Sequence, residues 1–560
     1  MKKSMPAVLF ALLASTALAG CSPSSKDGIE PYDKADLILI GKIYTQAGAA
    51  PVEAIAIEDG LVIYVGDGEW VEEFRGEHTQ EIRLGDAVAY PGFVDGHAHL
   101  TAIGLREMTL NLEGTSSVAD LQDRIAEEIS KQAPGAIIYG RGWIETGWPE
   151  GRFPNRDDLD AIAPDNPVIV ERADGHALLL NSLALAVAGI GDETANPEGG
   201  VIERDGNGRA TGILIDNAMM LAAGLMEDLS PTRRREALMK GGEVYASRGW
   251  TGVHNMSVEW DDVVEMMDLS EDNELGLRVY NAVVPEALDT LIDEGRQYSG
   301  NGRIITRAVK LYADGALGSR GAALKAPYAD KPERLGLVLM SEKQALGLME
   351  KAKAADIQTA THAIGDKGNQ LVLDWYASVL GEEGADRRWR IEHSQIVDPA
   401  DLPRFASQRV IASMQPSHAI GDLHFAPARL GDERLNGAYA WRSLVESGAM
   451  VVGGSDAPVE QGDPMIEFYA ATARRDLKGF QGDNWHAEEA LDREQALALF
   501  TSNAAYASFQ EDGLGALTPG NIADISVFSA DIMEIPLDDI PAVTAVMTIV
   551  DGEIIFDGRE

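Results

Sequence analysis

Short apolar runs that stop at glycine, proline or serine recur along this chain, and segments with helical patterns lie between them. The runs include Gln358-Thr-Ala-Thr-His and Val451-Val-Gly-Gly-Ser, and helical patterns cover residues 341–355 and 369–380. Strands that alternate with helices are typical of parallel βαβ units. The pattern therefore predicts an α/β fold with a parallel sheet.

Eight such runs lie between residues 91 and 456, and each predicts one strand. Eight parallel strands with intervening helices form a TIM (β/α)8 barrel, whose catalytic residues come from the carboxyl ends of different strands. We therefore expect a barrel over residues 91–511, with a site assembled from distant parts of the sequence. The eight predicted strands end at or contain His97, His254, residues 277–284, Lys310, His362, His393, residues 410–415 and Asp456.

Both ends of the chain show short strands separated by turns. Residues 35–90 contain Asp59-Gly60, a hairpin signal, and residues 512–560 contain runs such as Ala523-Asp-Ile-Ser-Val-Phe. Each end alone offers few strands. Together they predict a small composite β-sandwich.

The stretch from about residue 100 to 248, between predicted strands one and two, is far longer than a usual βα loop. It contains a helical pattern at residues 117–132 and a strand pattern at residues 168–172. We expect a subdomain that covers the barrel mouth, contributes to specificity and closes over the substrate.

Composition indicates a large, strongly acidic globular protein. The 560 residues are 45% hydrophobic, which is enough for a large core and a smaller domain. Lysine and arginine total 47 against 90 aspartates and glutamates, a balance that repels nucleic acid and anionic membranes. We therefore expect no nucleic-acid partner. The oligomeric state stays open, a homo-oligomer included.

The first residues predict export. Two lysines precede a mostly apolar run at residues 7–19, which has the form of a secretory signal and is too short to span a bilayer. Leu-Ala-Gly-Cys21 then resembles the lipobox of bacterial lipoproteins, and Cys21 is the single cysteine. We expect a signal peptide at residues 1–20, a tether over 21–34 and a lipid anchor to the membrane of the cell envelope, with the enzyme in the periplasm. Ser22 resembles an outer-membrane sorting signal, and plain secretion is the alternative.

The segment most informative for chemistry is Pro-Gly-Phe-Val-Asp-Gly-His-Ala-His-Leu at residues 91–100. Side chains alternate along a strand, so His97 and His99 face the same way. Two imidazoles on one face at a strand end can bind one divalent ion. The alternative is a pair of pocket histidines without a metal.

Five segments in a fixed order resemble those of a known family. They are the His97 segment, Val-Lys310-Leu-Tyr-Ala-Asp-Gly, Thr-His362-Ala-Ile-Gly-Asp, Arg-Ile-Glu-His393-Ser-Gln and Gly-Ser-Asp456-Ala-Pro. From about residue 36 to 557 the chain resembles the amidohydrolase superfamily, specifically its family 3 of YtcJ-like metal-dependent hydrolases. The resemblance implies a barrel inserted between the halves of the sandwich and a divalent, zinc-like centre of one or two ions. The implied ligands are His97, His99, Lys310, His362, His393 and Asp456.

The resemblance also implies that a carbamylated Lys310 bridges two ions and that Asp456 moves protons. A cation lowers the pKa of bound water to about 7, and a nearby carboxylate can pass the proton of that water to a leaving amine. The alternative for Lys310 is a salt-bridged barrel lysine. The alternative for Asp456, which precedes Ala-Pro, is a turn residue.

Five further residues are candidates for substrate binding at the barrel mouth. Two of them, His176 and Asn181, match a family segment near the substrate, and hydrogen bonding inside the inserted subdomain is their alternative. His254 is expected to be a core histidine with a satisfied hydrogen bond. The five candidates are Trp143, His176, Asn181, Arg320 and His418.

We expect an enzyme that hydrolyses a carbon–nitrogen bond other than a peptide bond in a small N-acyl or N-formyl amide. A cysteine-dependent D-amino-acid acylase of the same superfamily is improbable, because the only cysteine stands at the predicted anchor. Two alternatives stay open: a dipeptidase or ester or lactone hydrolase with the same centre, and a non-catalytic metal-dependent binding lipoprotein. The complete set of implied ligands favours the enzyme, since a binding protein needs no proton shuttle.

Overall fold

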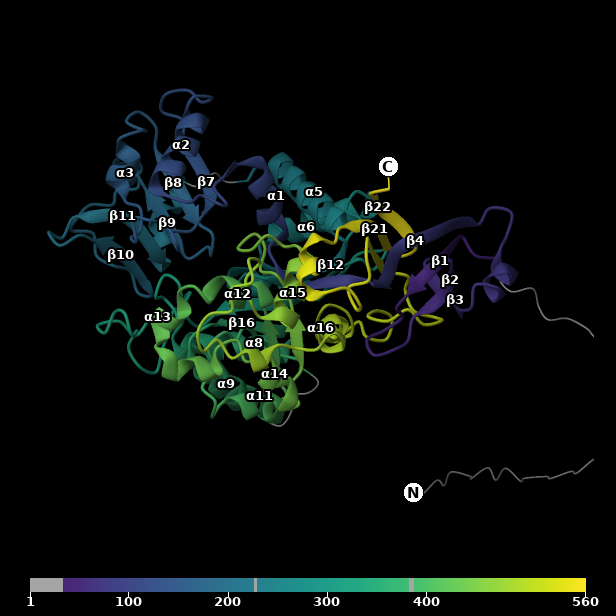
Figure 1. The fold of residues 1–560 in the computed structure, drawn as a ribbon. Helices are drawn as coiled ribbons and strands as arrows, with labels where there is room; N and C mark the ends of the chain where they lie inside the picture. Colours follow the sequence, from purple (N-terminus) through teal and green to yellow (C-terminus); the bar gives the residue numbers. More distant parts are fainter. Residues whose placement is uncertain (1–33, 226–228, 382–386, 560) are drawn as a thin grey trace, which may run out of the picture.

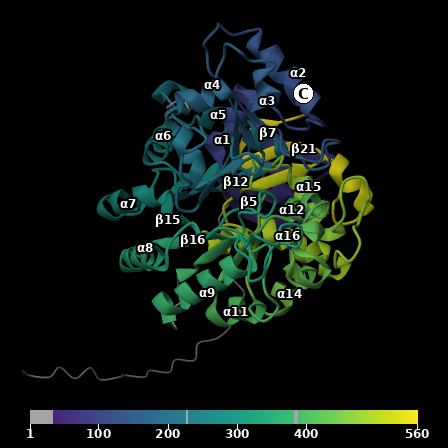
Figure 2. The ribbon, with the colours of Figure 1, turned by 90° about the vertical axis from the view of Figure 1, so that its left-hand side faces the viewer.

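A computed structural model describes residues 34–225, 229–381 and 387–559, which form three connected parts (Figures 1 and 2). A barrel lies between an inserted subdomain, on the left of Figure 1, and a sheet made from both chain ends, on the right. The predicted signal peptide, Cys21 and the predicted tether up to residue 33 lie outside the described residues. Within the described ranges, no helix has the length and apolar character needed to cross a membrane.

The barrel contains all eight predicted strands, and each strand pairs in parallel with the next along the chain. The short β14 (Gln297–Tyr298) pairs antiparallel with the fourth barrel strand. The barrel strands are β5 (Phe93–Ala98), β12 (Trp250–Val258), β13 (Arg278–Val283), β15 (Ile304–Tyr312), β16 (Gln358–Ala363), β17 (Arg390–His393), β18 (Ile411–Met414) and β19 (Val451–Gly453).

Two backbone hydrogen bonds join β5 to the segment after β19. Asp456 N donates to His97 O at 2.6 Å, and His99 N donates to Ala457 O at 2.8 Å. Gly96 permits this close approach, because a Cβ atom there would lie 2.4 Å from Gly453 O. The barrel is thus nearly closed, as predicted, and its closure brings Asp456 beside both histidines.

Helices separate the barrel strands, in agreement with the alternation seen in the sequence. The predicted helix at residues 341–355 is α8, which begins at a capping box formed by Ser341 and Gln344. The predicted helix at residues 369–380 lies within α9. The helices are α1 (Leu100–Met108), α5 (Pro231–Arg248), α6 (Trp260–Glu271), α7 (Leu288–Glu294), α8 (Glu342–Ala354), α9 (Asp366–Leu380), α11 (Leu402–Gln408), α12 (Pro416–Asp422), α13 (Ala426–Leu430), α14 (Trp441–Glu446), α15 (Pro464–Ala473), α16 (Arg493–Phe500) and α17 (Ser502–Ala507).

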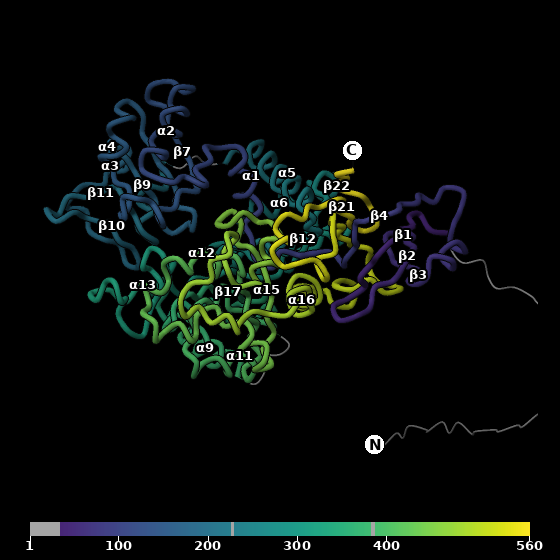
Figure 3. The backbone as a smooth tube through the Cα atoms, viewed as in Figure 1, coloured from purple at the N-terminus to yellow at the C-terminus, as the bar shows by residue number. Residues whose placement is uncertain are grey.

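The two chain ends meet in one seven-stranded sheet, where purple and yellow strands run side by side in Figure 3. Asp59 and Gly60 form the predicted hairpin turn between β2 and β3, with φ values of 48° and 76°. A two-sheet sandwich is not confirmed, because the described strands all belong to one hydrogen-bonded sheet. Its order is β22 (Glu553–Asp557), β21 (Ala545–Val550), β20 (Ile525–Phe528), β4 (Gln80–Pro91), β1 (Leu37–Ile43), β2 (Val52–Glu58) and β3 (Leu61–Gly66).

The inserted subdomain lies between α1 and α5 and has its own six-stranded sheet. The flanking helices pack closely, since a Cβ atom at Gly104 of α1 would lie 1.8 Å from Ala237 O of α5. The subdomain contains β6 (Leu110–Asn111), α2 (Val118–Ile129), β7 (Ile138–Trp143), α3 (Arg156–Asp160), β8 (Val168–Arg172), β9 (Ala177–Leu180), α4 (Ser182–Val187), β10 (Gly200–Arg204) and β11 (Ala210–Asp216).

Candidate metal centre

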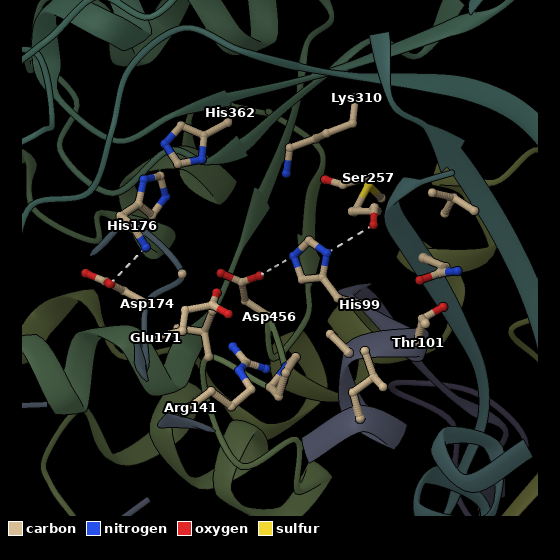
Figure 4. Close-up of a pocket in the computed structure, with 18 of the residues that line it drawn as sticks. His99, Thr101, Arg141, Glu171, Asp174, His176, Ser257, Lys310, His362 and Asp456 are labelled. Atoms are coloured by element: carbon tan, nitrogen blue, oxygen red, sulfur yellow. Dashed lines mark hydrogen bonds and ion pairs between the residues drawn. The ribbon is translucent and has the colours of Figure 1, made fainter. Parts of the chain in front are cut away.

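Four of the implied ligands meet at the carboxyl end of the barrel, although they stand far apart in the sequence. His97 belongs to β5, His393 ends β17 and Asp456 follows β19. One potential ligand atom from each of these three lies within 4.8 Å of the other two, and all three residues are buried. His99 joins them, since its Nε2 lies 3.1 Å from Asp456 Oδ1 (Figure 4).

The backbone is strained at two of these residues. Asp456 has a φ of 60° and His393 a φ of 75°, left-handed values that residues other than glycine rarely adopt. Such conformations cost free energy and cluster at functional sites. The strain therefore supports a functional role for both side chains.

The outward nitrogens of three histidines contact hydrogen-bond acceptors. His97 Nδ1 lies 2.5 Å from a carboxylate oxygen of Glu392, and His99 Nδ1 lies 3.0 Å from Met256 O. His393 Nδ1 lies 2.8 Å from Gln415 Oε1. Because each partner accepts, each Nδ1 carries the proton and each Nε2 presents a lone pair. This arrangement is common around metal-binding histidines.

The lone pairs of two of these nitrogens face a carboxylate oxygen. His97 Nε2 lies 3.3 Å from Asp456 Oδ1, and His99 Nε2 approaches the same oxygen. Burial, followed by the charge of Lys310, lowers the pKa of His97 to about 4, so this imidazole is neutral at pH 7. Lone pairs that face a carboxylate repel it unless a cation lies between them. Neutral imidazoles and a carboxylate also form the donor set that zinc prefers, so the residues fit a divalent cation.

His362 and Lys310 complete the implied set. His362, at the end of β16, has its ring centroid 4.5 Å from that of His393, and its buried Nε2 has no hydrogen-bond partner in the described part of the chain. Lys310 Nζ lies 3.3 Å from His97 Nε2, and burial lowers the pKa of the amine to about 8. No ion pair within 4.0 Å involves Lys310 among the described residues, which disfavours a salt-bridged lysine. Its carbamylation stays a prediction.

A buried network of hydrogen bonds and ion pairs holds Glu392, the partner of His97, in position. Arg390 forms an ion pair with Glu392, and its Nη2 donates to Gly96 O and Ser413 Oγ, each at 2.6 Å. Arg390 Nη1 lies 2.9 Å from Nδ1 of His254, so His254 is a buried histidine with a hydrogen-bond partner, as predicted. The charge of Arg390 and the hydrogen bond from His97 Nδ1 outweigh burial and hold the pKa of Glu392 well below its usual range.

Two of the five candidates for substrate binding lie at the centre. His176 reaches it from the inserted subdomain, with its ring centroid 5.2 Å from that of His362. Burial lowers the pKa of His176, but the hydrogen bond from Nδ1 to Asp216, at 2.6 Å, prevails and raises the pKa to about 9. His418 stacks on His393 at 6.0 Å, and its Nε2 lies 3.7 Å from Asp456 Oδ2.

The other three candidates lie elsewhere. Trp143 is fully buried in the subdomain core, where its Nε1 donates to Val170 O at 3.0 Å. Asn181 caps α4 and is also fully buried. Arg320 forms an ion pair with Asp330 at 2.8 Å and does not line the cavity above the metal centre. None of these three candidates lines the cavity.

A β-bulge explains why Trp143 points into the core. Alternation along β7 would place Arg141 and Trp143 on the same face. The register shifts between these two residues, and Gly142 has a φ of 105°. Arg141 consequently lines the cavity, whereas Trp143 turns away from it.

A cavity of about 320 Å³ lies above the centre and is lined by both the barrel and the inserted subdomain (Figure 4). This volume is in the range of small-molecule sites. The barrel contributes the metal-site residues together with apolar groups such as Leu105 and Val258. The subdomain contributes Arg141, Glu171 and Asp174, which the sequence did not single out. They stand in or directly after β7 and β8, and only the placement of this sheet over the barrel reveals them.

The chain matches the profile of the Amidohydrolase family over residues 80–556. It is 32% identical to the protein YtcJ of Bacillus subtilis, over 92% of this chain and 98% of that protein. It is 25% identical to the N-substituted formamide deformylase of Arthrobacter pascens, over 90% of this chain and 95% of that enzyme. An uncharacterized metal-dependent hydrolase from Pyrococcus horikoshii has a solved structure that superposes with a TM-score of 0.72 at 28% identity, covering 90% of this chain and 99% of that one.

Proposed function

Because this chain belongs to the amidohydrolase family, it is a hydrolase, and we propose that it cleaves a carbon–nitrogen bond other than a peptide bond in a small N-acyl or N-formyl amide. The observation that carries the proposal is the meeting of His97 Nε2 and His99 Nε2 at one oxygen of Asp456. The similarity to an N-substituted formamide deformylase supports an N-formyl or related N-acyl amide.

The residues fit one or two divalent ions, and we propose zinc. His97, His99, His362, His393 and Asp456 would hold the metal, and a carbamylated Lys310 would bridge two ions. When bound, the metal lowers the pKa of water and polarises a carbonyl group.

Asp456 is placed to move the proton. Burial raises its pKa, but the neighbouring imidazoles of His97 and His99 outweigh burial and hold the pKa well below the usual range, so Asp456 is ionised at neutral pH. Its Oδ1 contacts those two histidines, whereas its Oδ2 lies 3.7 Å from His418 Nε2. Oδ2 can therefore take a proton from water and deliver it to the leaving amine.

His418 is placed to assist at the carbonyl oxygen. Gln395 Nε2 donates to His418 Nδ1 at 2.8 Å, which leaves the imidazole proton on Nε2. That Nε2 is buried and has no hydrogen-bond partner among the residues described. It can donate to an oxygen on which negative charge develops, and the burial of this nitrogen strengthens such an interaction.

The test is turnover of a panel by purified, metal-replete protein, with chelator-treated protein and Asp456→Asn as controls. The panel contains N-formyl and N-acetyl amines, dipeptides, esters and lactones. We expect the amides to be hydrolysed best, and chelation or Asp456→Asn to abolish turnover. Preference for a dipeptide, ester or lactone would refute the proposed substrate class. Tight binding of a panel member without any turnover would identify a binding protein instead.

We further propose that a lipid on Cys21 anchors the protein to the cell envelope, with the enzyme in the periplasm. The support is the sequence Leu-Ala-Gly-Cys after an apolar run, together with the lack of any other cysteine in the chain. An anchor of this type holds stably when more than one acyl chain is attached.

A further inference from the structure

Arg141 is the arginine that lines this cavity, and its guanidinium forms no ion pair with a protein carboxylate in the described structure. Lys310, which also forms none there, belongs to the metal centre itself. Arg141 stands on β7 of the inserted subdomain, lines the same cavity as His99 and Asp456, and is only 6% exposed (Figure 4). Its Nε and Nη1 are buried without a hydrogen-bond partner, and no ion pair within 4.0 Å involves it among the residues described. An unpaired charge in such a place is costly unless a ligand offsets it.

The acidic residues around Arg141 already have partners of their own. Glu171, its neighbour on β8, accepts a hydrogen bond from Tyr139 Oη at 2.7 Å. Asp174 pairs with Arg172, and Asp262 pairs with Arg234 at 2.6 Å. Asp456 faces the histidines of the metal centre. None of these four carboxylates therefore forms an ion pair with Arg141.

We propose that Arg141 binds a carboxylate of the substrate, so that the substrate is an anionic amide such as an N-acyl or N-formyl amino acid. This inference rests on the proposed amide hydrolysis and narrows its substrate class. A guanidinium presents a planar pair of donors that matches the two oxygens of a carboxylate. A phosphate dianion fits less well, because Glu171, Asp174 and Asp456 on the same cavity would repel its second charge.

The position of Arg141 also indicates that the inserted subdomain takes part in substrate binding. The metal-site residues belong to the barrel, whereas Arg141 belongs to a separate sheet beside it. A substrate that contacts both is held between the two parts, with its amide at the metal centre and its carboxylate at β7. Orientation of this kind lowers the entropic cost of reaching the transition state.

The experiment compares two substrates that differ only by a carboxylate. N-formylphenylalanine and N-formyl-2-phenylethylamine, with the corresponding N-acetyl pair, are assayed with wild type, Arg141→Gln and Arg141→Lys. The matched control is Arg209→Gln, which removes an exposed arginine from the same subdomain, where it pairs with Asp157. A second arm measures binding of benzoate and of inorganic phosphate by calorimetry, which requires no turnover. Circular dichroism and the melting temperature check that each variant is folded.

We expect wild type to prefer the carboxylate-bearing amide. Arg141→Gln should lower the ratio of kcat/KM between the two substrates by about 10-fold to 100-fold, the range for loss of a charge-assisted hydrogen-bonded pair. Arg141→Lys should restore part of the ratio, and Arg209→Gln should leave it unchanged. Benzoate should bind more tightly than phosphate, and only the Arg141 variants should weaken it.

The outcomes separate this inference from the proposed function. Hydrolysis of both amides at equal rates, unchanged in Arg141→Gln, would overturn the carboxylate site while amide hydrolysis stands. Benzoate binding that depends on Arg141, without hydrolysis of any amide, would retain the site and overturn the proposed function. Tighter binding of phosphate than of benzoate would contradict the choice of a carboxylate. A loss of benzoate binding in Arg209→Gln equal to that in Arg141→Gln would show a general charge effect and overturn the assignment.

Discussion

Glu392→Gln should weaken metal binding, because Glu392 is the buried hydrogen-bond partner of His97. Glu392 is fully buried, and its Oε2 lies 2.5 Å from His97 Nδ1. Glutamine keeps the size of the side chain and one acceptor oxygen, but it removes the negative charge that makes His97 Nε2 a stronger donor to a cation. Loss of such an outer partner typically weakens metal affinity 10-fold to 100-fold. That range corresponds to about 1.4 to 2.7 kcal/mol.

The same change should also lower the melting temperature. Arg390 would lose its buried counter-charge, and unpaired buried charges destabilise proteins strongly. Arg390 would keep Gly96 O, Ser413 Oγ and His254 as partners, so the variant should still fold.

The assay is a zinc titration against a chromophoric chelator, with wild type, Glu392→Gln and the control Glu350→Gln, which alters an exposed residue of α8. The control should match wild type. A folded Glu392→Gln variant whose zinc affinity equals that of wild type would refute the assigned role of the Glu392 carboxylate, and with it the placement of zinc at His97.

The remaining predictions concern Lys310, His176 and Cys21. Lys310→Ala should reduce the metal content from two ions per chain to one by mass spectrometry, and unchanged metal content with full activity would argue against a bridging carbamate. Asp216 raises the folded-state pKa of His176 to about 9, so the stabilisation is complete below about pH 6.5 and is lost as the pH rises through 9. Asp216→Asn should therefore lower the melting temperature more at pH 6 than at pH 10, and equal losses would contradict this linkage. Cys21→Ser should move the protein from the membrane fraction to the soluble fraction, whereas a variant that stays membrane-bound would exclude the lipid anchor.

The barrel was predictable from the sequence because its strands are buried on both sides. Most of these strands are short, largely apolar runs, and five of them carry a polar candidate residue at or near their carboxyl ends. The order of the strands therefore predicts that His97, His99 and Asp456 lie together at the barrel mouth. Even the closure of the barrel, which joins Asp456 to β5, follows from the order of the strands.

Features that depend on register or on irregular backbone could not be predicted in this way. Glu392 contacts His97 Nδ1 only because the fold brings β17 close to β5. The local sequence around either residue does not indicate this contact. The bulge at Gly142 places Arg141 and Trp143 on different faces of β7, whereas regular alternation would place them on the same face. The sheet of the chain ends shows a similar limit, because the short strands indicate pairing but not whether they form one layer or two.

The most direct test of the metal centre is a crystal structure of the zinc-loaded protein with anomalous data collected at the zinc edge. The account predicts an anomalous peak about 2.0 to 2.2 Å from His97 Nε2, His99 Nε2 and a carboxylate oxygen of Asp456. Absence of a peak at these atoms, in crystals of protein that hydrolyses an amide at its full rate, would contradict the account.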